Sequence, residues 1–126
     1  MSKYFVVILG GGLGAVSRYI VGSLMARLYS GTFPAGTFLI NVTGSFLIGI
    51  LMTLFLNRST LHPNLRLFLV TGILGGYTTF SSFEWEALIT LRTGAAAISV
   101  LYIGSSVVLG LAAAWVGFVI SNRLWP

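Results

Sequence analysis

The chain has 126 residues, of which 56% are hydrophobic and only 7% are charged. Soluble domains average about 25% charged residues, so this chain cannot cover a water-facing surface, and we expect lipid to be its solvent. It has no cysteine, one histidine and no aspartate, and its net charge of +5 comes from scattered basic residues. These counts exclude disulfides, thiolate or multi-histidine metal sites and a Ser-His-Asp triad, and they argue against a nucleic-acid-binding patch.

Four apolar stretches follow one another along the chain, and each exceeds the roughly 20 residues needed to cross a bilayer core. They cover residues 4–28, 33–56, 66–91 and 95–120. Short breaks with turn chemistry separate them, around Gly31, around Ser59 and around Gly94. We therefore predict an all-α membrane protein with one domain over residues 1–126, four transmembrane helices, and both termini on the same side.

The basic residues give only a weak preference for one orientation. Lys3, Arg58, Arg66 and Arg123 lie on the side of the termini, and Arg27 and Arg92 lie on the other side. Basic residues favour the cytoplasmic side, and four against two is a small bias. Such a chain can insert both ways, which permits an antiparallel dimer but does not by itself establish one.

The first stretch contains a glycine motif and a charge. Residues 10–15, GGGLGA, match the dinucleotide-binding pattern, but no strand precedes them, so we interpret them as a surface for close helix packing. Gly72 and Gly76 have the same spacing in the third stretch. Arg18 lies inside the first stretch, where a charge is costly. Two readings stay open: its side chain reaches an interface, or it makes an anion vestibule electropositive.

The second stretch holds Asn41 within GTFLINVTGSF. A buried amide must find hydrogen-bond partners. Its NH2 group can donate to a partly dehydrated anion, because an anion only accepts hydrogen bonds. The other reading is a hydrogen bond between helices.

The third stretch contains GGYTTFSSFEWE, residues 75–86, which gathers helix breakers, hydroxyls and both acidic residues of the chain. Gly75 and Gly76 each weaken a helix by about 1 kcal/mol relative to alanine, so we predict a break near Gly75–Thr79. A break in the membrane frees backbone carbonyls that must be satisfied. A bound cation would satisfy them, whereas a glycine-lined helix crossing would need no ion.

Beyond the break, helical spacing aligns Thr79, Ser82 and Glu86 in one polar stripe, with Phe83 beside it and Phe80 one turn earlier. Aromatic side chains along one face of a helix usually serve only to pack against neighbouring helices. Phenyl rings nevertheless have a positive edge, and hydroxyls donate hydrogen bonds, so this combination can accept a small anion without trapping it. In the fourth stretch Tyr102 and Ser106 share a face and can line the same path.

Three motifs together resemble the Fluc (CrcB) family of bacterial fluoride channels, and the resemblance covers the whole chain. They are G-x-x-x-R-Y from Gly14 to Tyr19, G-T-F-x-x-N-x-x-G-S-F from Gly36 to Phe46, and G-x-x-G-G-Y-T-T-F-S-S-F-x-x-E from Gly72 to Glu86. The last motif is highly specific for a four-span chain of this length. The family commonly has threonine where this chain has Ser82, and serine keeps the hydroxyl.

The resemblance implies a passive, fluoride-selective channel in the bacterial inner membrane, built as an antiparallel dual-topology homodimer with two pores. Phe80 and Phe83 would line the pore, with Asn41 as its asparagine. The polar path would include Thr79, Ser82, Tyr102, Ser106 and Glu86. Main-chain oxygens of Gly75 and Thr78 from both subunits would hold a structural Na⁺. Gly110 lies one turn beyond Ser106, where a hydroxyl would extend the path, so the length of that path stays open.

Such a channel would be useful to a cell because hydrogen fluoride is a weak acid. HF crosses lipid from acidic surroundings and ionises in the cytoplasm, and a passive channel lets the trapped F⁻ leave. The main alternative is a small multidrug-type proton-coupled exporter, which needs a carboxylate in its first span, where this chain has Arg18. A purely structural membrane protein would not need clustered hydroxyls. We expect no enzyme, because no nucleophile–base pair is visible.

Overall fold

The computed structural model describes residues 2–58 and 60–126. Within these residues the chain forms helices and turns and no β-strand, which confirms the all-α prediction. Its elements are α1 (Lys3–Leu28), α2 (Ala35–Asn57), α3 (Pro63–Arg66), the π-helix η1 (Leu67–Leu74), α4 (Gly75–Tyr77), α5 (Phe80–Arg92) and α6 (Ala96–Leu124). Ser59, in the second predicted break, lies outside the described residues.

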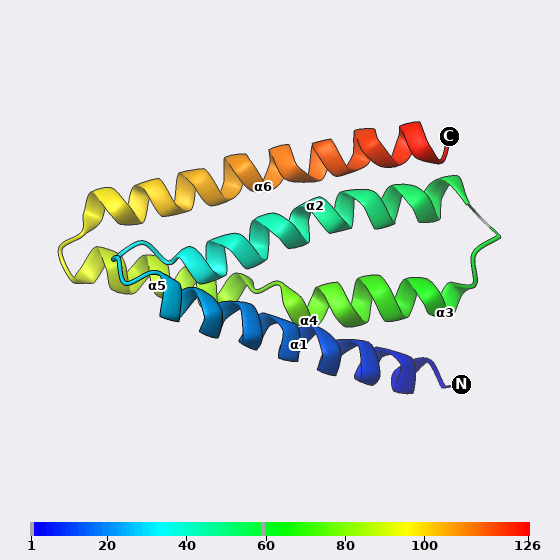
Figure 1. The fold of residues 1–126 in the computed structure, drawn as a ribbon, viewed down its shortest axis with the longest axis horizontal. Coiled ribbons are helices and arrows are strands. Elements are labelled where there is room, and N and C mark those ends of the chain that lie inside the picture. The colour runs from blue at the N-terminus through cyan, green and yellow to red at the C-terminus, as the bar shows by residue number, and fades with distance from the viewer. Residues whose placement is uncertain (1, 59) are drawn as a thin grey trace.

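In the described part of the chain, three helices are long and apolar enough to cross a membrane. They are α1 with 26 residues, α2 with 23 and α6 with 29, and they correspond to the first, second and fourth predicted spans. The third predicted span is a chain of shorter elements. Figure 1 shows these four rods as an elongated bundle with the N and C termini at the same end, as an even number of spans requires.

The predicted break in the third rod is present. α3, η1 and α4 follow one another without interruption up to Tyr77, and α5 begins at Phe80. Between them Thr78 and Thr79 have extended backbones, with φ/ψ of −79°/158° and −151°/120°. The prediction that the glycines themselves break the helix is wrong, because Gly75 and Gly76 lie in the helical turn of α4.

The π-helix just before the break is a feature that the sequence did not indicate. At its end the Gly75 N–H donates to the carbonyl of Val70, five residues back, and to that of Gly72. A π-helix is rare and often lies next to functional sites. Here η1 and α4 lead directly to the extended pair.

Within this chain, helices come closest to one another at glycine residues. A side chain on Gly14 would collide with the Ile73 carbonyl, and one on Gly76 with the Gly11 carbonyl, so α1 packs tightly on η1 and α4. Likewise Gly49 on α2 faces the Ala114 carbonyl on α6. The predicted small-residue surfaces of residues 10–14 and 72–76 therefore pack against each other within one chain.

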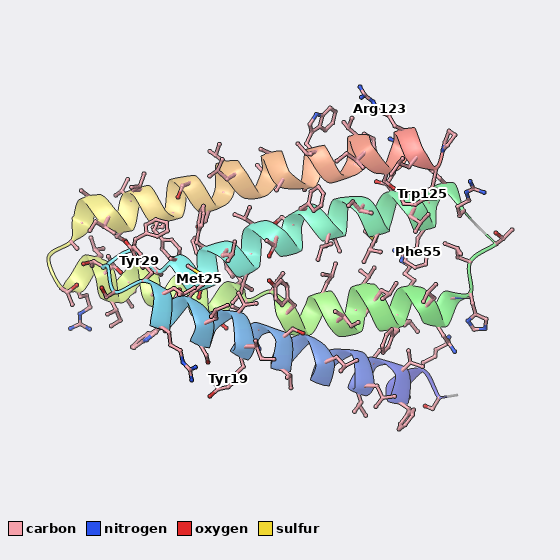
Figure 2. The ribbon with its side chains drawn as sticks, in the orientation of Figure 1. Tyr19, Met25, Tyr29, Phe55, Arg123 and Trp125 are labelled. Carbon is pink, nitrogen blue, oxygen red and sulfur yellow. The ribbon has the colours of Figure 1, made fainter. Side chains whose placement is uncertain are left out.

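The outer surface of the bundle is apolar and the core is thin. Tyr102 is fully buried, and Ile40 and Val6 are nearly so. Many large apolar side chains instead point outward, such as Tyr19, which is 76% exposed and extends away from α1 in Figure 2. Such a surface needs lipid or another protein as its neighbour, as expected for a chain that spans a membrane.

The turns at the two ends use ordinary local chemistry. Gly94, with φ of +89°, ends α5 and allows the chain to turn into α6. At the opposite end the Asn57 amide donates to the Asn122 side chain at 2.9 Å and to the Trp125 carbonyl at 2.7 Å, which ties the end of α2 to the end of α6. Trp125 and the outward-pointing Arg123 are visible there in Figure 2.

Candidate functional site

A pocket of about 430 Å³ opens beside the break in the third rod. α2, η1, α4, α5, α6 and the extended pair all contribute to its wall. Seven residues that the sequence singled out line it, namely Asn41, Gly75, Thr78, Thr79, Phe80, Phe83 and Ser106. Arg18, Ser82, Glu86 and Tyr102 do not belong to this lining. Most of the candidate site thus lines one hollow beside the break in the third rod.

Asn41 bridges α2 to the break. Its Nδ2 donates to the Thr79 carbonyl and its Oδ1 accepts from the Thr79 N–H, both at 2.9 Å. The amide therefore pairs with a backbone that has left its helix, much as a neighbouring strand would. Asn41 thus joins α2 to the extended break of the third rod, while anion binding by Asn41 stays a prediction. Its NH2 group has a second N–H besides the one used here, and Asn41 also lines the pocket.

Arg18 approaches the break from α1, whereas Asn41 approaches it from α2. Its guanidinium is 3.4 Å from the Thr78 carbonyl, so it contributes a donor to an oxygen that the helix has released. The side chain is half-buried and does not line the pocket. Among the described residues no hydrogen bond ends on the Gly75 carbonyl, whose usual partner, the Thr79 N–H, bonds to Asn41 instead.

The start of α5 orders two hydroxyl groups. Thr79 caps the helix, because its Oγ1 accepts from the Ser82 N–H at 3.3 Å. The same hydroxyl donates its proton to Ser82 Oγ at 3.0 Å. Ser82 thus accepts one bond and retains its own proton for donation.

Ser106 supplies a hydroxyl to the pocket from α6. Its Oγ is buried and has no hydrogen-bond partner in the described part of the chain. An unpaired buried hydroxyl costs free energy, about 1–3 kcal/mol, unless a ligand or water pairs with it. The pocket beside it is the place from which such a partner can come.

Aromatic rings continue from the pocket into the bundle. The ring centroids of Phe80 and Phe83 are 5.8 Å apart, and those of Phe83 and Tyr102 are 5.1 Å apart. Phe33 meets Tyr102 nearly edge-on, at 5.4 Å and 82°. Phe80, at one end of this row, is 71% exposed, so its ring faces whatever lies outside the chain.

Glu86 lies beyond the rings, beside the first turn of α2. Its Oε1 accepts from Thr37 Oγ1 and its Oε2 from the Tyr102 hydroxyl, both at 2.8 Å. Tyr102 has one hydroxyl proton, and it donates that proton in its hydrogen bond to Glu86. In this arrangement the Tyr102 ring packs against Phe83 beside the pocket, while the Tyr102 hydroxyl donates to the Glu86 carboxylate and not to the pocket. Glu86 and Thr37 also line a second pocket of about 240 Å³ under the α1–α2 loop.

The residue-by-residue reasoning missed two polar residues of α2. Thr37 binds Glu86, and Ser45 lines the main pocket. A signal was available, since Thr37, Asn41 and Ser45 recur every four residues and so share one face of the helix. Among the described residues, no group of three or more His, Cys, Asp or Glu side chains can hold a metal.

Comparison with known proteins gives consistent matches over nearly the whole chain. The family pattern described as "CrcB-like protein, Camphor Resistance (CrcB)" matches residues 5–118. A protein of Solibacter usitatus, named fluoride-specific ion channel FluC, is 46% identical over 96% of this chain and 99% of its own length. A protein of the same name from Acidobacterium capsulatum is 48% identical over 97% of this chain and 98% of its own length. Another, from Methylobacterium sp., is 51% identical over 95% of this chain and 96% of its own length. The chain therefore belongs to the CrcB family.

Proposed function

We propose that this chain is a passive, fluoride-selective channel that lets F⁻ leave the bacterial cytoplasm. The relatives that match it almost end to end are named fluoride-specific ion channels. Its three long apolar helices suit a multi-pass membrane protein. The observation that carries the proposal is the Ser106 hydroxyl, which is buried and has no hydrogen-bond partner among residues 2–58 and 60–126, in a pocket bordered by Phe80 and Phe83.

The chemistry of the pocket suits a small anion. Ser106 and the second N–H of Asn41 supply donors without a full positive charge. Ser82 lies outside the lining, and it retains a hydroxyl proton next to Thr79, which does line the pocket. The rings of Phe80 and Phe83 add surface whose edges are weakly positive. Weak, repeated sites let an ion enter and also leave, which conduction requires. Outward movement needs no energy source when the membrane potential is negative inside.

An antiparallel homodimer completes this proposal. The pocket borders groups that face outside one chain, including Phe80 and Gly75. The weak charge bias between the two ends allows insertion in both orientations. A second copy placed on this face would close the hollow and give two equivalent pathways.

A structural Na⁺ is part of the same proposal. The Gly75 carbonyl accepts no hydrogen bond within the described residues, and Gly75 is exposed on the outside of the single chain, so its oxygen is available to a hard cation. The Thr78 carbonyl fits less well, because Arg18 already lies 3.4 Å from it. Two oxygens are fewer than a hard cation takes, so the same pair from a second copy would be needed to hold a sodium ion.

The proton-coupled exporter has no support in the structure. α1 contains no carboxylate, and both oxygens of Glu86 are engaged by hydroxyls. The carboxylate that such an exporter uses to bind cations is therefore absent from the first span.

Fluoride efflux from liposomes that contain the purified protein tests the proposed function. We expect rapid F⁻ efflux, recorded with a fluoride electrode, when a potassium ionophore balances the charge. Chloride loaded in the same way should stay inside. No fluoride efflux, or chloride efflux at a matching rate, would refute fluoride-selective conduction.

A further inference from the structure

Ser45 faces the main pocket from α2, and neither the sequence motifs nor the comparisons give it a role. It lines the pocket together with Asn41, one helical turn before it, and with Ser106 on α6. Among residues 2–58 and 60–126 no hydrogen bond involves its hydroxyl, although the side chain is half-buried. Within the described residues the hydroxyl proton of Ser45 is therefore free to donate a hydrogen bond into the pocket.

Other hydroxyls of α2 behave differently. Thr43 and Thr53 donate to carbonyls of their own helix four residues back, both at 2.7 Å. This local bond is the usual way for a helical hydroxyl to satisfy its proton in a membrane. Ser45 does not use it, so its proton remains available to the pocket.

The packing of α2 on α6 explains where this hydroxyl lies. The two helices run side by side in the same direction (Figure 1), and Gly49 faces Ala114 while Asn57 bonds to Asn122. In the same register Asn41 lies level with Ser106, and Ser45 lies level with Gly110. A methyl group on Gly110 would indeed be 3.5 Å from Ser45 Oγ.

Gly110 is the position at which α6 lacks a hydroxyl one turn beyond Ser106. The structure puts a hydroxyl at that level from the neighbouring helix instead. The polar surface of the pocket therefore does not end at Ser106 but crosses from α6 to α2.

We propose that Ser45 donates a hydrogen bond to the conducted anion and extends the polar path one helical turn beyond Ser106 toward the end that carries the termini. This inference rests on the proposed fluoride conduction. It adds a donor from α2 at the level where α6 has Gly110.

The test compares fluoride efflux from liposomes for four variants. Ser45→Ala should slow efflux about tenfold, the worth of about one hydrogen bond to a charged group. Ser45→Cys keeps the size but offers a weak donor, so it should also be slow. Gly110→Ser placed in the Ser45→Ala background should restore efflux to within about twofold of the wild-type rate, because a 3.5 Å contact leaves room for a side chain there. Ser105→Ala is the control, since Ser105 bonds to its own helix and does not line the pocket.

The outcomes separate this inference from the proposed function. If the wild-type protein does not conduct fluoride, the proposed function fails. If it conducts and Ser45→Ala or Ser45→Cys matches its rate, the role of Ser45 fails. A slow Ser45→Ala that Gly110→Ser does not rescue, with both variants eluting like the wild type, would also overturn it. Rescue by the relocated hydroxyl would support the inference directly, because a purely structural role for Ser45 does not predict it.

Discussion

Asn41 shows how one side chain can stabilise an irregular backbone and still face a pocket. Its amide satisfies both the N–H and the carbonyl of Thr79, which would be orphaned at a helix break. From the sequence, a buried amide favoured pairing between helices over anion binding. The actual partner could not be predicted, because it requires Thr79 to be extended, and that depends on tertiary packing.

Replacing Asn41 by alanine should therefore damage stability and conduction together. Two hydrogen bonds to a partly buried backbone disappear, and each orphaned group costs about 1–3 kcal/mol. We expect a lower thermal unfolding temperature in detergent and strongly reduced fluoride efflux. Thr53→Ala is a matched control, because Thr53 bonds only to its own helix and lies outside the pocket. Wild-type unfolding of Asn41→Ala would contradict the bridging role.

Among the elements, the third rod is where sequence and structure differ most. The break near Gly75–Thr79 could be predicted, since two glycines that weaken a helix are followed there by two β-branched threonines. Its position at Thr78 and Thr79 could not, because the glycines remain helical and are used for contact with α1. The π-helix η1 was also beyond prediction, since the apolar pattern does not distinguish bonds five residues back from bonds four residues back.

Close packing of α1 on the broken rod gives a direct test at the scale of elements. Gly14→Ala places a methyl group against the backbone at Ile73 and Tyr77, neither of which can move without shifting the helix that leads to the break. We expect a loss of about 1–3 kcal/mol of stability, seen in thermal unfolding. Gly12→Ala, two residues away with open space beside it, should have little effect. Equal stability of both variants would show that α1 does not need this approach.

For the whole molecule, the four rods, their apolar outer surface and the shared end of the termini follow from the length and hydropathy of the sequence. The convergence of Asn41, Phe80, Phe83 and Ser106 on one pocket does not, because these residues belong to three different rods. Helical spacing related Phe80 to Phe83 and Tyr102 to Ser106, but Tyr102 does not line the pocket. Only the packing of α2 and α6 beside the break brings the lining residues together.

The proposed dual topology can be tested with cysteines, because the chain has none of its own. Pro126→Cys and Thr93→Cys place thiols at opposite ends of the bundle. In sealed vesicles an impermeant thiol reagent should label about half of each variant from outside, since weak charge bias allows both orientations. Nearly complete labelling of one variant together with none of the other would show a single orientation and exclude the antiparallel dimer.

The central claim is that the pocket beside the break is the conduction path for fluoride. The most direct measurement is fluoride efflux from liposomes for the wild type, Phe80→Ile and Phe83→Ile at equal protein content. We predict rapid efflux for the wild type and none for either variant, with all three eluting alike in detergent, because isoleucine keeps apolar bulk but has no ring edge. Wild-type efflux from both variants would contradict the claim that these rings line the path.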